Sequence, residues 1–228
     1  IEDACHALGG KYSKTKFLVG SCKYSDITTF SLHPVKTITS GEGGLICTNN
    51  NKIAEKIKIL RSHGITNRNK YIYDIKKCSF NFRLSDINCA LASSQLDKTK
   101  KFIKKRRQLV KRYSKNFNKY SNLIEIINID DFKYSAWHLL IVKVNVENFD
   151  KEKFYDLLLN YKIKSQLHYI PTYRLSTFKK NNSINFKKTN LNSEIYFKKC
   201  ISLPLYFKLK LKDVDFISNI VLKILLKI

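Results

Sequence analysis

The sequence contains no methionine and little glycine, proline or tryptophan. Its 228 residues include 7 glycines, 3 prolines and 1 tryptophan, against a hydrophobic content of 43%. This composition excludes a collagen-like or low-complexity chain and indicates a globular protein with a real core. Position 1 is isoleucine, and the opening residues have neither the basic nor the apolar segment of a leader peptide. We therefore expect this sequence to be a piece of a longer chain.

Long apolar runs and metal-binding spacings are also missing. Even the apolar C-terminal stretch is interrupted by polar residues, namely Ser218, Asn219, Lys223 and Lys227. We expect no membrane partner for that reason. The 6 cysteines form no C-x-x-C pair and no Cys/His spacing of a zinc site, so we predict no bound metal. We interpret the cysteines as small buried side chains of a protein in a reducing cytoplasm.

Acidic residues are scarce: 18 stand against 43 basic residues, which gives a formal net charge of +25. Such a charge is typical of proteins that bind nucleic acid or an anionic surface. Only seven of the basic residues are arginine, however, and arginine is the side chain that recognises bases and phosphates in a bidentate manner. Abundant Lys, Ile and Asn are also what an AT-rich coding sequence produces. We therefore predict a solvated lysine surface and no nucleic-acid partner; a basic nucleic-acid-binding module is the less favoured alternative.

Hydrophobic periodicity predicts short strands alternating with helices, which indicates an α/β fold. In the first part we expect strands at residues 1–5, 27–32 and 45–48, with helices at 51–62 and from Ser85. A charged helix at 98–120 follows, and the domain junction is placed near its start. Beyond it we expect an α+β unit with strands at 123–127 and 139–146 and helices at 150–161 and from Asp213. The polar segment 179–192 indicates a mobile loop.

Three motifs carry a more specific signal: I-E-D-A-C-H-A at 1–7, S-L-H-P-V-K-T-I-T-S-G-E-G-G at 31–44, and N-F-R-L-S-D-I-N at 81–88. In this order they resemble the sugar aminotransferases of the DegT/DnrJ/EryC1/StrS family, and the resemblance runs over nearly the whole chain. It implies that residues 1–98 are the C-terminal part of the large, cofactor-binding domain of a fold-type-I pyridoxal-phosphate (PLP) enzyme. Residues 99–228 would then be a linking helix and a small C-terminal α+β domain. It also implies that the first portion of the large domain, which helps to hold the cofactor phosphate and ring, lies outside this sequence.

The resemblance implies roles for three residues near the cofactor ring. Lys36 matches the family's lysine that binds the cofactor aldehyde and later moves a proton, as an amine can. Asp3 matches the carboxylate that keeps the pyridine nitrogen protonated, so that the ring can act as an electron sink. His6 matches a residue beside the ring and its phenolic oxygen. Each residue alone would be read as a surface lysine, a strand-end carboxylate or a structural histidine.

Two further residues match ligands of the cofactor phosphate. Ser31 would donate its hydroxyl to that anion, which backbone N–H groups also hold. Asn81 matches an asparagine that reaches the phosphate of the neighbouring subunit, which implies a homodimer with shared sites. Without the resemblance, Ser31 is an ordinary strand-end residue and Asn81 a turn residue.

The substrate side of the site is less specific. Arg83, His138, His168 and Tyr169 are candidates by their positions in the matching motifs, although a packing role is equally consistent with His138. The motif set looks most like enzymes that aminate a UDP-linked 4-keto-6-deoxy-N-acetyl sugar with glutamate as donor, in the synthesis of pseudaminic acid or a surface polysaccharide. The alternatives are an inactive or partial chain of this kind, a 3-amino or dTDP/GDP-sugar aminotransferase, and a sugar dehydratase; Lys36 argues against the last.

Overall fold

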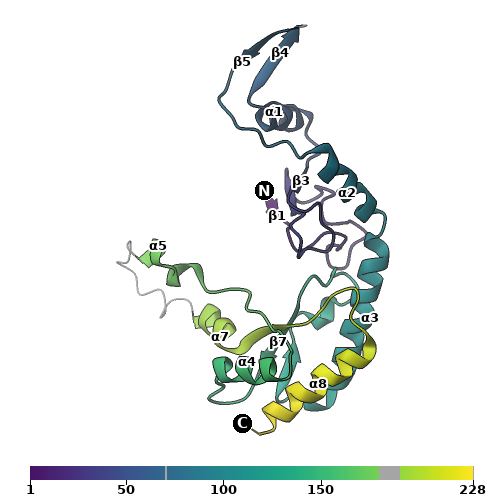
Figure 1. Ribbon diagram of the computed structural model, residues 1–228, viewed down its shortest axis with the longest axis vertical. Coiled ribbons are helices and arrows are strands. Elements are labelled where there is room, and N and C mark those ends of the chain that lie inside the picture. Colours follow the sequence, from purple (N-terminus) through teal and green to yellow (C-terminus); the bar gives the residue numbers. More distant parts are fainter. Residues whose placement is uncertain (70, 180–190, 228) are drawn as a thin grey trace. The chain divides into compact units, whose positions relative to one another are not determined.

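The computed structural model describes residues 1–69, 71–179 and 191–227, and the chain in it divides into two compact units. The first unit comprises residues 1–104 and 133–138, and the second comprises residues 105–132 and 139–228. Figure 1 labels many of their elements. Residues 180–190 of the loop predicted at 179–192 lie outside the described part of the chain.

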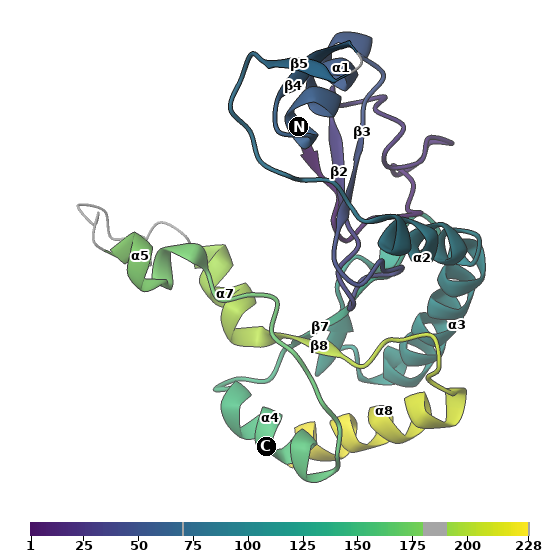
Figure 2. The ribbon, with the colours of Figure 1, turned by 45° about the horizontal axis from the view of Figure 1, so that its top comes forward.

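A small mixed sheet organises the first unit. Strand β1 (Glu2–Asp3) pairs in parallel with β2 (Thr28–Ser31), and β2 pairs antiparallel with β3 (Gly44–Cys47). Figure 2 shows β2 and β3 side by side with their connecting loop at one end. Along β2 the side chains of Thr28 and Phe30 are buried. These two side chains point to the face of the strand that lies in the core, and the residues that alternate with them point to the other face.

Helices and a hairpin complete the first unit. Helix α1 (Asn51–Arg61) begins after Asn50, whose side chain accepts hydrogen bonds from the amides of Lys52 and Ile53. This is the expected action of an N-cap asparagine. Strands β4 (Ile65–Asn69) and β5 (Ile72–Ile75) then form an antiparallel hairpin that the sequence pattern did not predict. Helix α2 (Asp86–Leu96) begins after its predicted cap, Ser85.

The apolar residues of α2 lie at helical spacing but do not pack within this chain. Ile87 is 83% exposed, and Leu91 and Leu96 are exposed as well. On the hairpin, Tyr71, Ile72 and Tyr73 also face outward. The pattern that predicted an amphipathic helix is thus present, but its apolar face is not covered by the residues that the structure describes.

The second unit contains an antiparallel sheet flanked by helices. Its strands, in the order β6-β7-β8, are β6 (Ile124–Ile126), β7 (Leu140–Val144) and β8 (Cys200–Leu203). Its longer helices are α4 (Lys151–Asn160), α7 (Leu191–Lys199) and α8 (Leu211–Leu225), and α3 (Thr99–Phe117) begins in the first unit. Shorter helical segments are η1 (Asn118–Tyr120), η2 (Ile129–Asp131), η3 (Thr172–Arg174) and α5 (Ser176–Lys179).

The core of this unit lies between the sheet and its helices. Leu140, Val142 and Val144 alternate along β7 and are fully buried, as the alternating pattern predicted. Helix α8 runs beside α4 (Figure 1), and its Val214 and Val221 are also fully buried. The predicted start of α8 at Asp213 is two residues late. The Asp213 carboxylate accepts the backbone N–H of Lys210, the residue before the helix, at 2.8 Å. Asp213 thus lies in the first turn of α8 and its side chain reaches back to cap the start of the helix.

One expectation about side-chain environment is wrong for most of the residues concerned. The cysteines were predicted to be buried, but Cys200 alone is; Cys5, Cys22 and Cys47 are half-buried, and Cys78 and Cys89 are exposed. All six are free thiols. Across the described ranges, no helix combines the length and apolar character needed to cross a bilayer.

Candidate active site

Asp3 and Ser31 lie at the same edge of the first sheet. Glu2 pairs with Thr28 and Asp3 with Thr29 in a parallel register, and the amide of Ala4 donates to the carbonyl of Thr29 at 2.9 Å. In a parallel pair both chains leave the sheet at one edge, and ligands of α/β proteins bind outside that carboxyl edge. Two of the residues predicted to touch the cofactor are therefore brought together by backbone pairing alone.

The Asp3 carboxylate is held in its ionised form. Hydrogen bonds from the thiol and the backbone amide of Cys5 lower the pKa of Asp3, and the charges of His6 and Lys36 act in the same direction, while some loss of solvation opposes them. The amide bond measures 3.1 Å from Cys5 N to Asp3 Oδ1. The same hydrogen bond to Asp3 raises the pKa of the Cys5 thiol, which stays a donor. An ionised carboxylate with basic groups around it is suited to pair with a protonated ring nitrogen.

Lys36 lies in the loop between β2 and β3, and it is half-buried. Backbone bonds close the loop: Leu32 N donates to Gly43 O at 2.8 Å, and Ser40 N donates to Leu32 O at 3.0 Å. Within it, Lys36 N donates to His33 O at 2.9 Å, which forms a turn at H-P-V-K. The loop thus projects from the same edge that carries Asp3 and Ser31, and the charge of Lys36 acts on Asp3.

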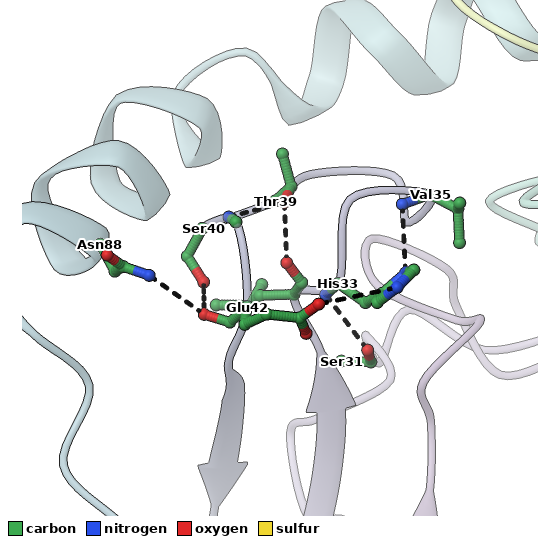
Figure 3. A network of polar contacts seen from close by, with 9 residues as sticks. Ser31, His33, Val35, Thr39, Ser40, Glu42 and Asn88 are labelled. Atoms are coloured by element: carbon green, nitrogen blue, oxygen red, sulfur yellow. Dashed lines mark hydrogen bonds and ion pairs between the residues drawn. The ribbon is translucent and has the colours of Figure 1, made fainter.

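Side chains stiffen this loop from within, as Figure 3 shows. The hydroxyl of Thr39 donates to Leu32 O at 2.8 Å, and the hydroxyl of Ser40 donates to Glu42 O at 2.7 Å. Asn88 of α2 donates to the same Glu42 carbonyl at 3.5 Å. The loop that carries Lys36 is therefore held by its own hydroxyls and by a helix from elsewhere in the unit.

Gly43 fills a position that no other residue fits well. Its φ is +145°, a conformation that L side chains rarely adopt, and an added Cβ would come within 2.8 Å of both Leu84 Cδ1 and Ser40 Oγ. The G-E-G-G turn is thus a structural requirement of the Lys36 loop.

Ser31 and His33 share the first turn of the loop (Figure 3). The Ser31 hydroxyl oxygen accepts the backbone N–H of His33 at 3.3 Å, so its own proton points elsewhere and can be donated to an anion. The His33 ring lies 3.8 Å from the Glu42 carboxylate, with both side chains exposed. Exposed pairs of this length contribute little to stability.

His6 and His138 are brought together although they are far apart in the sequence. Their ring centroids lie 4.4 Å apart, tilted by 54°. His138 is buried, and residues 133–138 belong to the first unit. His6, which is predicted to contact the cofactor, thus packs against His138, a candidate for substrate binding. This contact is consistent with a packing role for His138 as well as with a binding role.

Asn81 and Arg83 are exposed, and they are joined by a hydrogen bond between residues two positions apart. Asn81 Oδ1 accepts the backbone N–H of Arg83 at 3.2 Å, and Asn81 pairs with Ser62 in a single β-bridge. Phe80 and Phe82 stand beside Asn81 at 73% and 65% exposure. In the part of the chain that the structure describes, Asn81 has no hydrogen bond to Asp3, Ser31 or Lys36.

His168 and Tyr169 belong to the second unit. His168 Nδ1 lies 2.8 Å from Ser202 Oγ of β8, and the two adjacent rings stand edge to face with centroids 4.7 Å apart. Tyr169 is 62% exposed and offers its ring and hydroxyl to solvent.

Sequence reasoning missed two contributors to this site, Cys5 and Glu2. Cys5 donates to Asp3 as described above, and Glu2 accepts hydroxyl hydrogen bonds from Tyr12 and Thr28. Both occur within the I-E-D-A-C-H-A motif, so their positions next to Asp3 were the available signal. The described residues contain no group of three or more His, Cys, Asp or Glu side chains placed to hold a metal ion.

The residues present fit pyridoxal phosphate. An ionised carboxylate, a half-buried lysine amine and a serine hydroxyl with a free proton meet at one strand edge, which matches the ring nitrogen, aldehyde and phosphate of that cofactor. The fold and the site together define an α/β protein of the PLP-enzyme type.

Residues 1–222 match the DegT/DnrJ/EryC1/StrS aminotransferase family, and the chain belongs to this family. The cofactor of the family is PLP. The predicted α/β class is confirmed, since 99% of the chain superposes on an aminotransferase structure.

Three relatives illustrate the match. A Campylobacter jejuni (serotype O:23/36) protein named UDP-4-amino-4,6-dideoxy-N-acetyl-beta-L-altrosamine transaminase is 38% identical over 230 residues, covering 100% of this chain and 59% of the relative. Helicobacter pylori PseC, an aminotransferase of pseudaminic acid biosynthesis, superposes with a TM-score of 0.89 at 29% identity, covering 99% of this chain and 59% of the other. The PLP form of a Streptococcus pneumoniae sugar aminotransferase, Spr1654, gives 0.85 at 29% identity over 99% of this chain and 57% of that one. The chain therefore spans about three fifths of the length of these relatives.

Proposed function

We propose that the complete protein containing this chain is a PLP-dependent aminotransferase that acts on a nucleotide-linked keto sugar. Its substrate would be a UDP-linked 4-keto-6-deoxy-N-acetyl sugar and its amino donor glutamate, in the synthesis of pseudaminic acid or another surface polysaccharide. The observation that carries the proposal is the meeting of Asp3 and Lys36 at the carboxyl edge of β1 and β2. The names of the Campylobacter and Helicobacter relatives support the choice of sugar.

Each residue has a defined task in this proposal. When bound, PLP supplies an electron sink and a carbon that carries the amino group between donor and acceptor. Lys36 would hold it; once the amino donor has displaced the lysine, its Nζ would take a proton from Cα of the donor, and in the second half of the reaction it would deliver a proton to C4 of the sugar. Asp3 would keep a proton on the ring nitrogen, and Ser31 would donate its hydroxyl to the phosphate. His6 would lie beside the ring.

The domain assignment is part of the same proposal. Residues 1–98 would be the C-terminal part of the large domain, and residues 99–228 the linking helix and small α+β domain. The start of α3 at Thr99 supports a junction there, while chain packing places the division between units a few residues further along this helix.

A homodimer with shared active sites is also proposed. Asn81 lies between the exposed Phe80 and Phe82 in the sequence, and the preceding hairpin carries further exposed apolar side chains, Tyr71 and Ile72. Soluble monomers rarely expose such groups together, and exposed apolar patches mark contact surfaces. A second copy covering this surface would place Asn81 at the interface, as its proposed contact with the neighbouring cofactor requires. The mass in solution, measured by light scattering, tests the dimer.

Substrate recognition is assigned to Arg83, His138, His168 and Tyr169. The guanidinium of Arg83 suits a diphosphate, and the exposed ring of Tyr169 suits a sugar or base. A different nucleotide sugar is the second candidate, because GDP-perosamine synthase of Escherichia coli O157:H7 matches 78% of this chain at 28% identity. Turnover of UDP- against GDP- and dTDP-linked keto sugars separates the two. The six free thiols fit the proposed cytoplasmic location.

The absorption spectrum of the complete protein that contains this chain tests the function. With PLP we expect a visible band that shifts when glutamate is added and that is missing in Lys36→Ala. Absence of the band in the unmutated protein would instead favour an inactive relative. We expect the 228 residues alone to bind PLP weakly, because the resemblance assigns part of the cofactor site to residues outside them.

A further inference from the structure

We infer that Glu2 is a positioning residue, which fixes Asp3 from the opposite face of β1 through a cluster of hydroxyl groups. The inference rests on the proposed function, because it concerns how Asp3 is held against the ring nitrogen of PLP. Nothing in the resemblance assigns a role to Glu2.

Strand β1 is too short to hold itself in place. It comprises Glu2 and Asp3, and backbone bonds tie it to β2 through Glu2 N to Ile27 O at 2.8 Å and Ala4 N to Thr29 O at 2.9 Å. Strands of ordinary length make several more such bonds. Asp3 itself is exposed, so no packing of its own side chain restrains it.

The Glu2 carboxylate supplies the missing attachment. Tyr12 Oη donates to Glu2 Oε2 at 2.6 Å, and Thr28 Oγ1 donates to the same oxygen at 3.0 Å. Ser25 Oγ lies 3.0 Å from Thr28 Oγ1 and 3.4 Å from Glu2 Oε2. Each hydroxyl has only one proton to donate. Tyr12 and Thr28 therefore donate hydrogen bonds to the carboxylate, and Ser25 donates its hydrogen bond to the Thr28 hydroxyl.

These donors come from separate segments of the first unit. Thr28 is fully buried in β2, next to Glu2 in the parallel register, and Tyr12 and Ser25 belong to the segment between β1 and β2. The bond to Glu2 raises the pKa of Tyr12 to about 12, so the phenol stays a donor at every physiological pH. Because successive side chains of a strand point to opposite faces, this anchor leaves Asp3 directed away from it.

Tyr12→Phe removes the shortest of these bonds and one oxygen atom. Tyr24→Phe is the matched control, because the Tyr24 ring packs edge-on against Tyr12 with centroids 4.8 Å apart while its side chain is exposed. The probe is the ratio of affinities for PLP and for 1-deaza-pyridoxal phosphate, in which carbon replaces the ring nitrogen. That analogue cannot make a charged hydrogen bond to Asp3, so the ratio measures the Asp3 contact alone.

In the complete protein we expect Tyr12→Phe to lower the PLP-to-analogue affinity ratio by about 10-fold, and Tyr24→Phe to leave it unchanged. A role in general stability would weaken both ligands equally, and an unaltered ratio in Tyr12→Phe would therefore overturn the inference. If the unmutated protein binds PLP no better than the analogue, the proposed role of Asp3 fails instead. Thr28→Val provides a second, independent loss of a donor to Glu2, for which the ratio should also fall.

Discussion

Replacement of Gly43 by alanine should destabilise the loop that carries Lys36. The backbone at Gly43 has φ of +145°, where a residue with a Cβ costs about 1–3 kcal/mol. The new methyl group would also meet Leu84 Cδ1 and Ser40 Oγ at 2.8 Å. The leucine end can rotate away, but moving Ser40 breaks its hydrogen bond to Glu42 O, worth about 1 kcal/mol.

Gly41→Ala is the comparison that separates backbone strain from crowding. Gly41 also has a positive φ, of +85°, but the nearest atom to an added Cβ is Asn88 Nδ2 at an ordinary 3.6 Å. We expect a loss of about 1 kcal/mol for Gly41→Ala and about 2–4 kcal/mol for Gly43→Ala. Urea unfolding of both variants measures the difference. The reasoning is refuted if Gly43→Ala is no less stable than Gly41→Ala.

Three other perturbations follow from contacts described above. Hydrogen bonds from Arg112 and Asn116 lower the pKa of Asp215 in the folded protein. The ionised Asp215 therefore stabilises the fold at pH values above its pKa in the unfolded chain, and this stabilisation is lost as the pH falls through the lower pKa of the folded protein. Asp215→Asn should therefore flatten the acid side of the stability profile, by about 1 kcal/mol because the pair is partly exposed. Phe154→Ala empties a fully buried site and should cost about 3–5 kcal/mol in chemical unfolding; a loss under 1 kcal/mol would contradict the packing. Cys5→Ala removes the thiol bond to Asp3, so the pKa of Asp3 should rise, and Cys5→Ser should restore part of the effect; carboxyl NMR titration would reveal either result.

Local signals predicted several of the regular elements, but not β8, α7 or the β4–β5 hairpin. Capping residues and apolar spacing placed α1 and α4 within a residue or two, and the alternation along β7 predicted its buried face. The β4–β5 hairpin was missed because its connection lacks the Asn-Gly or Asp-Gly pair that marks tight turns. The face of α2 could not be assigned, because periodicity shows that a stripe is apolar but not what covers it.

The site was predictable only as far as the motifs reach. Their order assigned Lys36, Asp3 and Ser31 to one cofactor, and parallel pairing of β1 with β2 does place Asp3 and Ser31 at one edge. The partner of His6 could not be read from the sequence, because His138 reaches it only through tertiary folding. The hydroxyl cluster on Glu2 was hidden for the same reason.

The short span of sequence between Asp3 and Lys36 has a consequence for how the protein folds. Joining β1 to β2 closes a loop of fewer than thirty residues, while joining β7 to β8 closes one roughly twice as long. Each doubling of a loop adds about 0.6 kcal/mol of closure entropy, so chain statistics favour forming the lysine–carboxylate edge first. Asp3 and the Lys36 loop would then be brought to the same sheet edge early in folding, before the sheet of the second unit is complete.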